Sequence, residues 1–300
     1  SYKLILSQLI SVEKLSDIDY VLDSDLELLD SYSQTAHDLK YGDIFDGFVD
    51  SLSRYPDNTL VLSDDVSYTY AEGAYLIKQI QDLLIDAGIG VGDKVSVFVD
   101  RNQWVLLSNM GVLSVGATYV PLDENHPDER IKYMIEKSES RAVIVTDTFQ
   151  RRVEELDEDI AVINVSSLAC EGRLTSLDYV DSSANDVACI LFTSGTTGNP
   201  KAVQVGRYSV TNMVSFYAHN SNFTTGDVYG VFASVGFDVS LQHYAALLCG
   251  GAVTWVPNDI KLNIKKLNEY FMKYGVTHTI ITTQVSKLFV STVKETSIKN

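Results

Sequence analysis

Between positions 191 and 201 the chain reads Leu191-Phe192-Thr193-Ser194-Gly195-Thr196-Thr197-Gly198-Asn199-Pro200-Lys201. The preceding residues 187–190 form an apolar run, which predicts a buried strand leading into this stretch. A loop rich in glycine and hydroxyl residues can bend sharply and can surround an anion with backbone N–H groups and side-chain donors. The sequence therefore predicts a phosphate-binding loop directly after a strand.

Two simpler interpretations of this loop are possible. An ordinary P-loop nucleoside triphosphatase requires the pattern Gly-x-x-x-x-Gly-Lys-Ser/Thr, which does not occur here. A hydroxyl-rich surface turn is the usual outcome for a generic cluster of this composition. This stretch is far more specific than a generic turn, because a strand leads into it, its residues stand in this order and a Pro200-Lys201 pair closes it.

The loop resembles the phosphate-binding signature of the adenylate-forming superfamily, which includes acyl-CoA synthetases, luciferases and the adenylation domains of nonribosomal peptide synthetases. The positions that match this signature are Thr193, Ser194, Gly195, Thr196, Thr197, Gly198 and Lys201. Ala202 stands where the family usually has glycine, and Gly206-Arg207 stands where a glutamate-histidine pair is common. We expect these departures to affect loop mobility and reaction rate more than the fold.

Composition restricts the class of protein. The 300 residues are 45% hydrophobic, which is enough for a large core in one or two domains. A formal net charge of −17 argues against nucleic acid or an anionic membrane as a partner, because both bind basic surfaces. The sequence shows no signal peptide and no uncharged apolar run near the ~20 residues of a membrane span. We therefore expect a cytoplasmic protein.

No metal site or disulfide framework is expected. The three cysteines are scattered and lack a metal-binding spacing. His219, His243 and His278 have neither metal spacing nor an evident nucleophile partner, so we interpret them as structural.

Apolar periodicity predicts alternating helices and strands between residues 44 and 165. Thr69 and Glu72 form a capping-box pattern at the start of one of the helices. Strands are expected at 59–62, 94–99, 117–123, 142–145 and 160–165, and helices at 44–52, 70–84, 104–115 and 129–137. The remainder of 149–183 is expected to be acidic and rich in loops. This alternation predicts an α/β fold of layered, mostly parallel sheets flanked by helices, which alone indicates no function.

The first residues have a different character. Amphipathic spacing predicts a helix over 2–10, and an acidic stretch that follows predicts a solvated linker. The segment also resembles the junction after a condensation domain in peptide synthetases, which ends in a small Thr-Ala element, here Thr35-Ala36. The resemblance implies that 1–38 is a linker from a preceding condensation domain and that 39–300 is a partial N-terminal core of an adenylation domain.

Two further segments resemble the family, and both are interpreted as structural. They are residues 67–72 and residues 116–123 with His126-Pro127 and Arg130. The second segment is closer to the peptide synthetases than to the acyl-CoA synthetases.

The substrate side is predicted from Phe237-Asp238-Val239-Ser240, which follows an apolar strand expected at 228–233. An aspartate there is costly to desolvate without a cation, which a ligand ammonium could supply. Alternatively Asp238 or Ser240 is an N-cap of the helix expected at 241–248. The segment resembles the family's Phe-Asp-x-Ser element, whose aspartate binds the α-ammonium of an amino acid. The resemblance implies side-chain-pocket positions at Val239, Gln242 and Ile280, with Phe237 between the acyl pocket and the carrier-arm tunnel.

The resemblance implies a reaction of an amino acid with Mg-ATP to give aminoacyl-AMP and pyrophosphate, followed by transfer to phosphopantetheine on a peptidyl carrier domain. Thr193 and Lys201 are the implied catalytic residues, and the cofactors are ATP, Mg²⁺ and the partner's phosphopantetheine. Expected partners are the carrier and condensation domains of the same assembly line and a small activator protein. Proline-like residues, serine and ornithine are the candidate substrates.

Several alternatives stay open at this point. One is an acyl- or aryl-CoA synthetase of the same superfamily, one is a degenerate adenylation domain that acts as a scaffold, and one is a plain nucleotide-binding module. The family's later motifs for adenine, ribose and magnesium, and its C-terminal domain, have no match in the 300 residues. We therefore expect this chain alone to be inactive.

Overall fold

The computed structural model describes residues 2–18, 20–34, 38–64, 66–181, 183, 186–193 and 200–299. Its contacts divide the chain into two compact units, residues 1–40 and residues 41–300. Each unit is described by itself.

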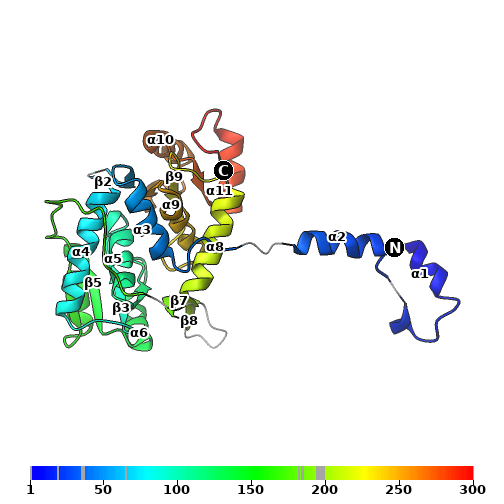
Figure 1. The fold of residues 1–300 in the computed structure, drawn as a ribbon, viewed down its shortest axis with the longest axis horizontal. Helices are drawn as coiled ribbons and strands as arrows, with labels where there is room; N and C mark the ends of the chain where they lie inside the picture. The colour runs from blue at the N-terminus through cyan, green and yellow to red at the C-terminus, as the bar shows by residue number, and fades with distance from the viewer. Residues whose placement is uncertain are drawn as a thin grey trace. The chain divides into compact units, whose positions relative to one another are not determined.

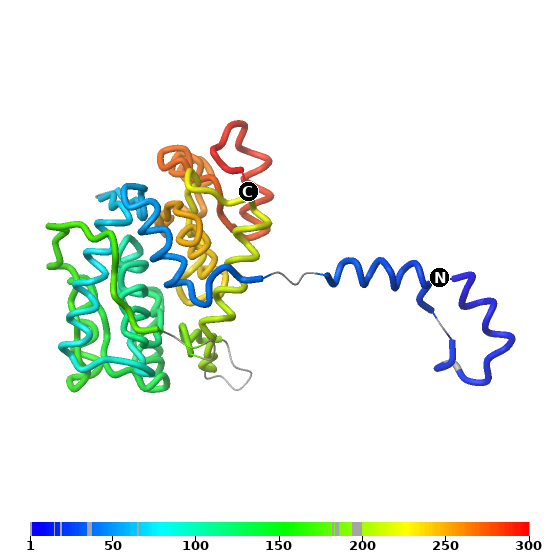
Figure 2. The backbone as a smooth tube through the Cα atoms, in the orientation of Figure 1, coloured from blue at the N-terminus to red at the C-terminus, as the bar shows by residue number. Residues whose placement is uncertain are grey.

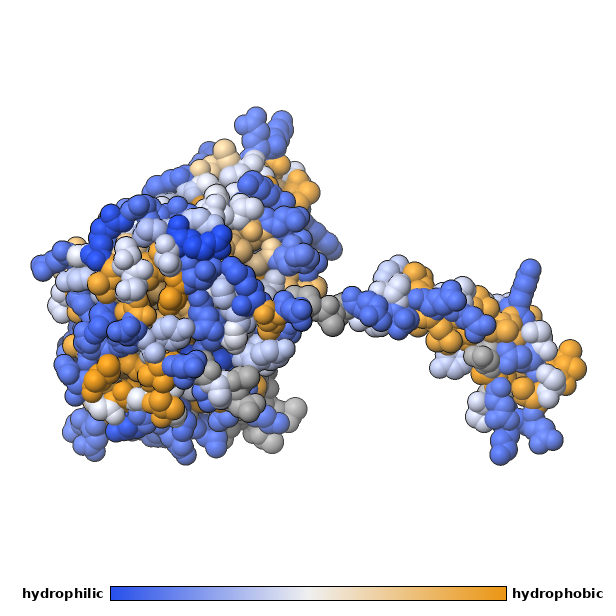
Figure 3. Space-filling view, in the orientation of Figure 1, coloured by the Kyte–Doolittle hydropathy of each residue, from blue (hydrophilic) through white to orange (hydrophobic). Residues whose placement is uncertain are grey.

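The first unit contains helix α1 (Tyr2–Gln8), the 3-10 helix η1 (Leu15–Asp17) and helix α2 (Asp23–Ser33). The predicted opening helix is confirmed, whereas the acidic stretch is more than a linker because it forms α2. Asp23 and Asp25 lie in the first turn of α2, where negative charge is favourable to the helix dipole. No residue of α1 or α2 is buried, and apolar side chains lie on the surface of the unit (Figure 3). Thr35 and Ala36 lie outside the described residues, and the condensation-domain linker remains a prediction.

A six-stranded sheet forms one half of the second unit, in the order β6-β5-β3-β4-β7-β8 (Figure 1). Neighbouring strands are parallel except for the last pair, β7 and β8, which is antiparallel. The strands are β3 (Lys94–Phe98), β4 (Thr118–Pro121), β5 (Ala142–Val145), β6 (Ala161–Asn164), β7 (Val187–Thr193) and β8 (Lys201–Gly206).

A five-stranded sheet forms the other half, in the order β11-β9-β10-β1-β2. Its strands are parallel except for the pair β1 and β2. They are β1 (Thr59–Leu62), β2 (Ser67–Thr69), β9 (Val228–Val231), β10 (Ala252–Trp255) and β11 (His278–Thr279). The predicted architecture of layered, mostly parallel sheets is confirmed.

Helices fill the space between the sheets and cover their outer faces. The main apolar core joins the inner faces of both sheets with α3 (Ile44–Arg54), α4 (Tyr70–Asp86), α5 (Gln103–Ser114), α8 (Arg207–Asn220) and α9 (Tyr244–Cys249). Helices α6 (Asp128–Ser138) and α7 (Asp147–Leu156) cover the outer face of the six-stranded sheet. Helices α10 (Ile264–Tyr274) and α11 (Thr283–Thr292) cover the five-stranded sheet. Two short 3-10 helices, η2 (Asp238–His243) and η3 (Asn258–Ile260), complete the unit.

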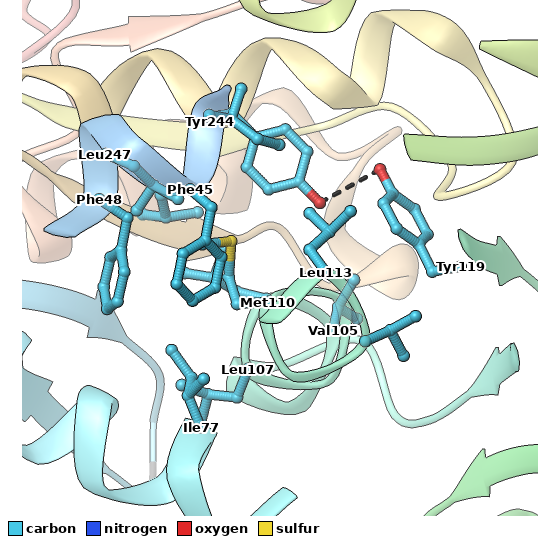
Figure 4. Packing of buried hydrophobic residues seen from close by; sticks show 14 of the residues in the cluster. Phe45, Phe48, Ile77, Val105, Leu107, Met110, Leu113, Tyr119, Tyr244 and Leu247 are labelled. Carbon is cyan, nitrogen blue, oxygen red and sulfur yellow. Dashed lines mark hydrogen bonds between the residues drawn. The ribbon is translucent and has the colours of Figure 1, made fainter. Parts of the chain in front are cut away.

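Segments far apart in sequence meet in the central layer. Helix α3 packs beside α9, and Figure 2 shows the early blue segment next to the later orange one. Phe45 and Phe48 of α3 face Leu247 of α9 in this layer (Figure 4). The hydroxyl of Tyr244 donates a hydrogen bond of 3.1 Å to the hydroxyl of Tyr119, so the core also connects α9 to β4 (Figure 4).

Local sequence signals account for most element boundaries. The capping box is confirmed, because Thr69 accepts from the Glu72 backbone N–H and the Glu72 carboxylate accepts from Thr69. Two expectations were wrong. Residues 147–156 form helix α7, whose apolar residues Phe149 and Val153 are buried. The helix expected from 241 begins instead with the 3-10 turn of η2 and becomes α-helical at Tyr244.

A buried ion pair connects three helix ends in the central layer. Arg207, at the start of α8, and Asp43, the N-cap of α3, have only 1% and 4% of their side chains exposed. The Arg207 guanidinium donates to an Asp43 carboxylate oxygen at 2.6 Å, and to the backbone carbonyls of Leu113 and Ala117 at 3.0 and 3.1 Å. The departure from the family pattern at Arg207 therefore has a structural role in this chain.

Replacement of Arg207 by methionine should lower the free energy of unfolding by about 3–5 kcal/mol, because it leaves the Asp43 carboxylate buried without its cation. Urea unfolding followed by circular dichroism measures this change. The matched control is Arg151→Met, which removes a pair between highly exposed side chains and should change stability by less than about 1 kcal/mol. Equal changes in the free energy of unfolding would show that the buried pair contributes no more stability than the exposed pair.

Candidate functional site

The predicted phosphate loop connects the two strands of an antiparallel hairpin. Thr193, the last residue of β7, pairs directly with Lys201, the first residue of β8, and both side chains are exposed. The structure thus holds the two ends of the loop side by side. The predicted phosphate-binding residues Ser194, Gly195, Thr196, Thr197 and Gly198 lie outside the described residues.

A cavity of about 660 Å³ opens beside this hairpin. Its walls come from β7, β8, α8 and the start of η2, so it joins the base of the loop to the predicted substrate segment. Thr193, Phe237 and Asp238 all line it. Two parts of the sequence that were predicted separately, the base of the loop at Thr193 and the Phe-Asp-x-Ser segment, therefore line one cavity.

Helix α6 supports the loop from the outer face of the sheet. The Tyr133 hydroxyl donates a hydrogen bond of 3.1 Å to the Pro200 carbonyl, and its ring makes an edge contact with Phe192. Arg130, from the same helix, lines the cavity beside Thr193, and its buried Nε has no hydrogen-bond partner among the described residues. From the sequence, Arg130 was interpreted as structural. Its place in a segment that resembles the family was a signal that its side chain could face an anion.

Asp238 is the first residue of η2, and its side chain is exposed. The carboxylate accepts a hydrogen bond of 2.8 Å from the adjacent Val239 N–H. Neither proposed capping role is observed: the N-cap position belongs to Phe237 without a side-chain cap, and Ser240 Oγ donates to backbone carbonyls. The Asp238 carboxylate is thus available to a cationic group that enters the cavity.

A second cavity, of about 400 Å³, lies next to Phe237. Phe237 lines both cavities and is 65% exposed. Val239 and Ile280, the predicted side-chain-pocket positions, line this second cavity together. Gln242 lies on η2 but lines neither cavity, and its buried Oε1 has no partner within the described part of the chain. The structure places Lys261 on the wall of this cavity as well, a residue that sequence reasoning did not select.

Of the three histidines interpreted above as structural, two are buried inside the second unit. His278 lies in β11 and His243 at the end of η2, whereas His219 is exposed. The His243 Nδ1–H donates to the Ser240 carbonyl and so holds the η2 turn that carries Asp238. Burial lowers the pKa of His243 to about 4, so its ring is neutral at pH 7. A structural interpretation of His243 agrees with this geometry.

Among the residues that the structure describes, no group of three or more His, Cys, Asp or Glu side chains could hold a metal ion. Within the same residues no helix has the length and apolar character needed to cross a membrane.

Comparison with known proteins places these features in context. A family model described as "AMP-binding enzyme" matches residues 48–299. Bacitracin synthase 1 of Bacillus licheniformis is 32% identical over 270 residues, which are 88% of this chain and 5% of that protein. Gramicidin S synthase 1 of Brevibacillus brevis is 29% identical over 240 residues, which are 77% of this chain and 21% of that protein. The chain therefore spans only a small part of these relatives.

Solved structures show the same fold. The nonribosomal peptide synthetase FmoA3 superposes with a TM-score of 0.81 at 22% identity, over 97% of this chain and 32% of that one. The N-terminal subdomain of Klebsiella oxytoca NpsA gives a TM-score of 0.72 at 23% identity, over 85% of this chain and 65% of that one. These matches confirm the predicted N-terminal adenylate-forming fold.

The free energy of unfolding should fall on acidification, in part because of His243. The folded state keeps its ring neutral down to a pKa of about 4, whereas the unfolded chain protonates near the ordinary value of 6.5. The unfolded state binds more protons in this window, so stability is lost as the pH decreases through it. Between about pH 7 and about pH 4.5 this contribution is on the order of 2 kcal/mol.

Urea titrations at both pH values test this contribution. His243→Gln should remove that part of the pH dependence, whereas His219→Gln, at an exposed site, should retain it. An unchanged pH dependence in the His243 variant would contradict the assignment.

Proposed function

The chain belongs to the AMP-binding enzyme family, and from this premise we propose that it is part of an adenylation domain that activates an amino acid for a nonribosomal peptide synthetase. One observation carries this proposal: the exposed carboxylate of Asp238 and the base of the phosphate loop at Thr193 line the same cavity. An amino acid held by its ammonium at Asp238 has its carboxylate directed toward a nucleotide held by the loop.

The reaction needs few groups from the protein. The substrate carboxylate attacks the α-phosphorus of ATP, the bond to the β-phosphate oxygen breaks, and pyrophosphate leaves. Positioning of the two reactants and neutralisation of negative charge on the phosphates lower the barrier. Thr193 and Lys201 stand at the two ends of the loop, where a hydroxyl donor and an ammonium suit these phosphates. They are the catalytic residues of the proposal, and the loop residues between them are proposed to bind the phosphates.

Mg²⁺ is proposed to bind together with the ATP phosphates. Mg²⁺ is usually held by one or two carboxylates together with substrate phosphates and water. Bound in this way, the ion would neutralise phosphate charge.

The second cavity is proposed to receive the substrate side chain. Val239 and Ile280 give it an apolar wall, and Phe237 separates it from the loop-side cavity. Gln242 remains a proposed pocket residue on the strength of the family resemblance alone.

Transfer of the acyl group to the phosphopantetheine thiol of a carrier domain follows as the second step. Carrier and condensation domains are proposed partners because the relatives are multidomain synthetases, one of them solved as a four-domain protein with AMP and glycine. A small activator protein and a cytoplasmic location remain predictions.

Amino-acid-dependent exchange of pyrophosphate into ATP tests the proposed reaction, measured on the native protein that contains this chain. We expect exchange with an amino acid, and loss of about a hundredfold in kcat/KM in Asp238→Asn, because a neutral amide cannot pair with the ammonium. Asp86→Asn is the matched control, since Asp86 is exposed at the end of α4. Exchange only with fatty or aryl acids would instead indicate an acyl-CoA synthetase, and no exchange with any acid would favour a scaffold.

Replacement of Lys201 by methionine should lower kcat of the same exchange by about ten- to a thousandfold, with a smaller change in the KM of the amino acid. The reason is that the ammonium acts on phosphate charge that develops during the reaction. Lys137→Met, which removes an exposed lysine at the end of α6, should leave both constants unchanged. A large rise in KM for the amino acid with kcat unaltered would place Lys201 in substrate binding.

A further inference from the structure

We propose that Lys261 makes the second cavity selective for an amino acid whose side chain ends in a carboxylate. This inference rests on the proposed function and adds a substrate class to it. Lys261 follows η3 and lines the same cavity as the predicted pocket residues Val239 and Ile280.

The cavity gives Lys261 an environment that is otherwise apolar. Most of its wall consists of apolar side chains and the remainder of two hydroxyl residues. The residues other than lysine are Phe232, Ala233, Ser234, Phe237, Val239, Ile280, Ile281 and Thr282. The Lys261 ammonium lies 5.4 Å from the centre of the Phe232 ring, in a cation–π contact. Burial, and then the charge of Arg101, lower the pKa of Lys261 to about 8, so at pH 7 it remains mostly a cation.

The nearby acidic groups do not neutralise this cation. Within the described residues, no carboxylate forms an ion pair with Lys261, and Asp123 and Glu124 act on it only at longer range. Asp123 accepts hydrogen bonds from Ser234 Oγ and from the Asn125 N–H. Glu124 accepts from the Asn258 side-chain amide at 2.6 Å. Both carboxylates are thus already engaged in fixing the surrounding loops.

A second cation, Arg101, does not line this cavity but adds positive charge close to Lys261. Arg101 donates hydrogen bonds to the carbonyls of Val231 and Val256 at 2.7 and 2.9 Å and packs over the Trp255 ring. These hydrogen bonds and the ring contact are with neutral groups. Burial lowers the pKa of Arg101 to about 10, and the nearby carboxylates of Asp123 and Glu124 partly oppose this shift. A partly desolvated cation gains most from an ionised hydrogen-bonding partner. A ligand carboxylate satisfies this requirement, whereas a cationic side chain such as that of ornithine would be repelled.

The geometry separates the two charges of such a substrate. Its α-ammonium pairs with Asp238 on the loop side of Phe237, and its side-chain carboxylate pairs with Lys261 in the second cavity. Opposite charges at the two ends of the site also set the orientation, because the reversed amino acid would place like charges together.

Exchange assays with paired substrates test this inference on the native protein that contains the chain. The panel comprises L-aspartate, L-glutamate and L-2-aminoadipate, with L-glutamine, L-leucine and L-ornithine as neutral and cationic comparisons. We expect one acidic member to exceed its neutral counterpart in kcat/KM by roughly ten- to a hundredfold. The advantage should decline from about pH 7 to about pH 9.5 as Lys261 loses its proton.

Variants identify the residue responsible. Lys261→Met should abolish the preference, Lys261→Arg should retain it, and Lys261→Glu should shift it toward cationic side chains. Lys265→Met is the control, because Lys265 lies nearby with 86% of its side chain exposed and lines neither cavity.

Two results would overturn the inference. Exchange with a neutral or cationic amino acid, at a ratio that Lys261→Met leaves unchanged, refutes the role of Lys261 while the proposed adenylation stands. Absence of exchange with every amino acid, with activity toward fatty or aryl acids, refutes both.

Discussion

The ion pair between Arg207 and Asp43 is the constraint on which the site depends. It joins the N-cap of α3 to the first residue of α8, and through the carbonyls of Leu113 and Ala117 it also fixes the chain between α5 and β4. Because α8 directly follows β8, this buried contact holds the far end of the hairpin that carries the phosphate loop. A buried pair of this kind is costly to break and makes the arrangement of the helices specific.

The two cavities of the site differ in the chemistry of the residues that line them. The loop-side cavity combines an exposed carboxylate, a strand-end hydroxyl and the arginine of α6, which suits charged reactants. The second cavity is mostly apolar with one cation, which suits recognition of a side chain. Phe237 lines both cavities, so in the proposed function it stands between the reacting groups and the pocket for the substrate side chain. In the proposed function, the strongly acidic chain holds anionic ligands by local cations and not by its net charge.

Local patterns in the sequence were sufficient for the α/β architecture, for the strand before the loop and for the capping box at Thr69. They failed where tertiary contacts decide. Helix α7 has few apolar residues and a highly charged surface. Its helical spacing was therefore not recognised, and the segment was predicted to be rich in loops. Arg207 has its partner 164 residues away in sequence, so its role depends on topology. Lys261 looks like an ordinary surface lysine, and its significance appears only when η3 places it on the wall of the second cavity.

The central claim is that Asp238 recognises an α-ammonium beside the phosphate loop. The most direct test is calorimetric binding of a non-hydrolysable aminoacyl sulfamoyl adenosine, compared with the same compound lacking the α-amine. We expect the amine to strengthen binding by roughly a hundredfold in the native protein and to make little difference in Asp238→Asn. Equal affinity of the two compounds in the native protein would contradict the assignment of this site to an amino acid.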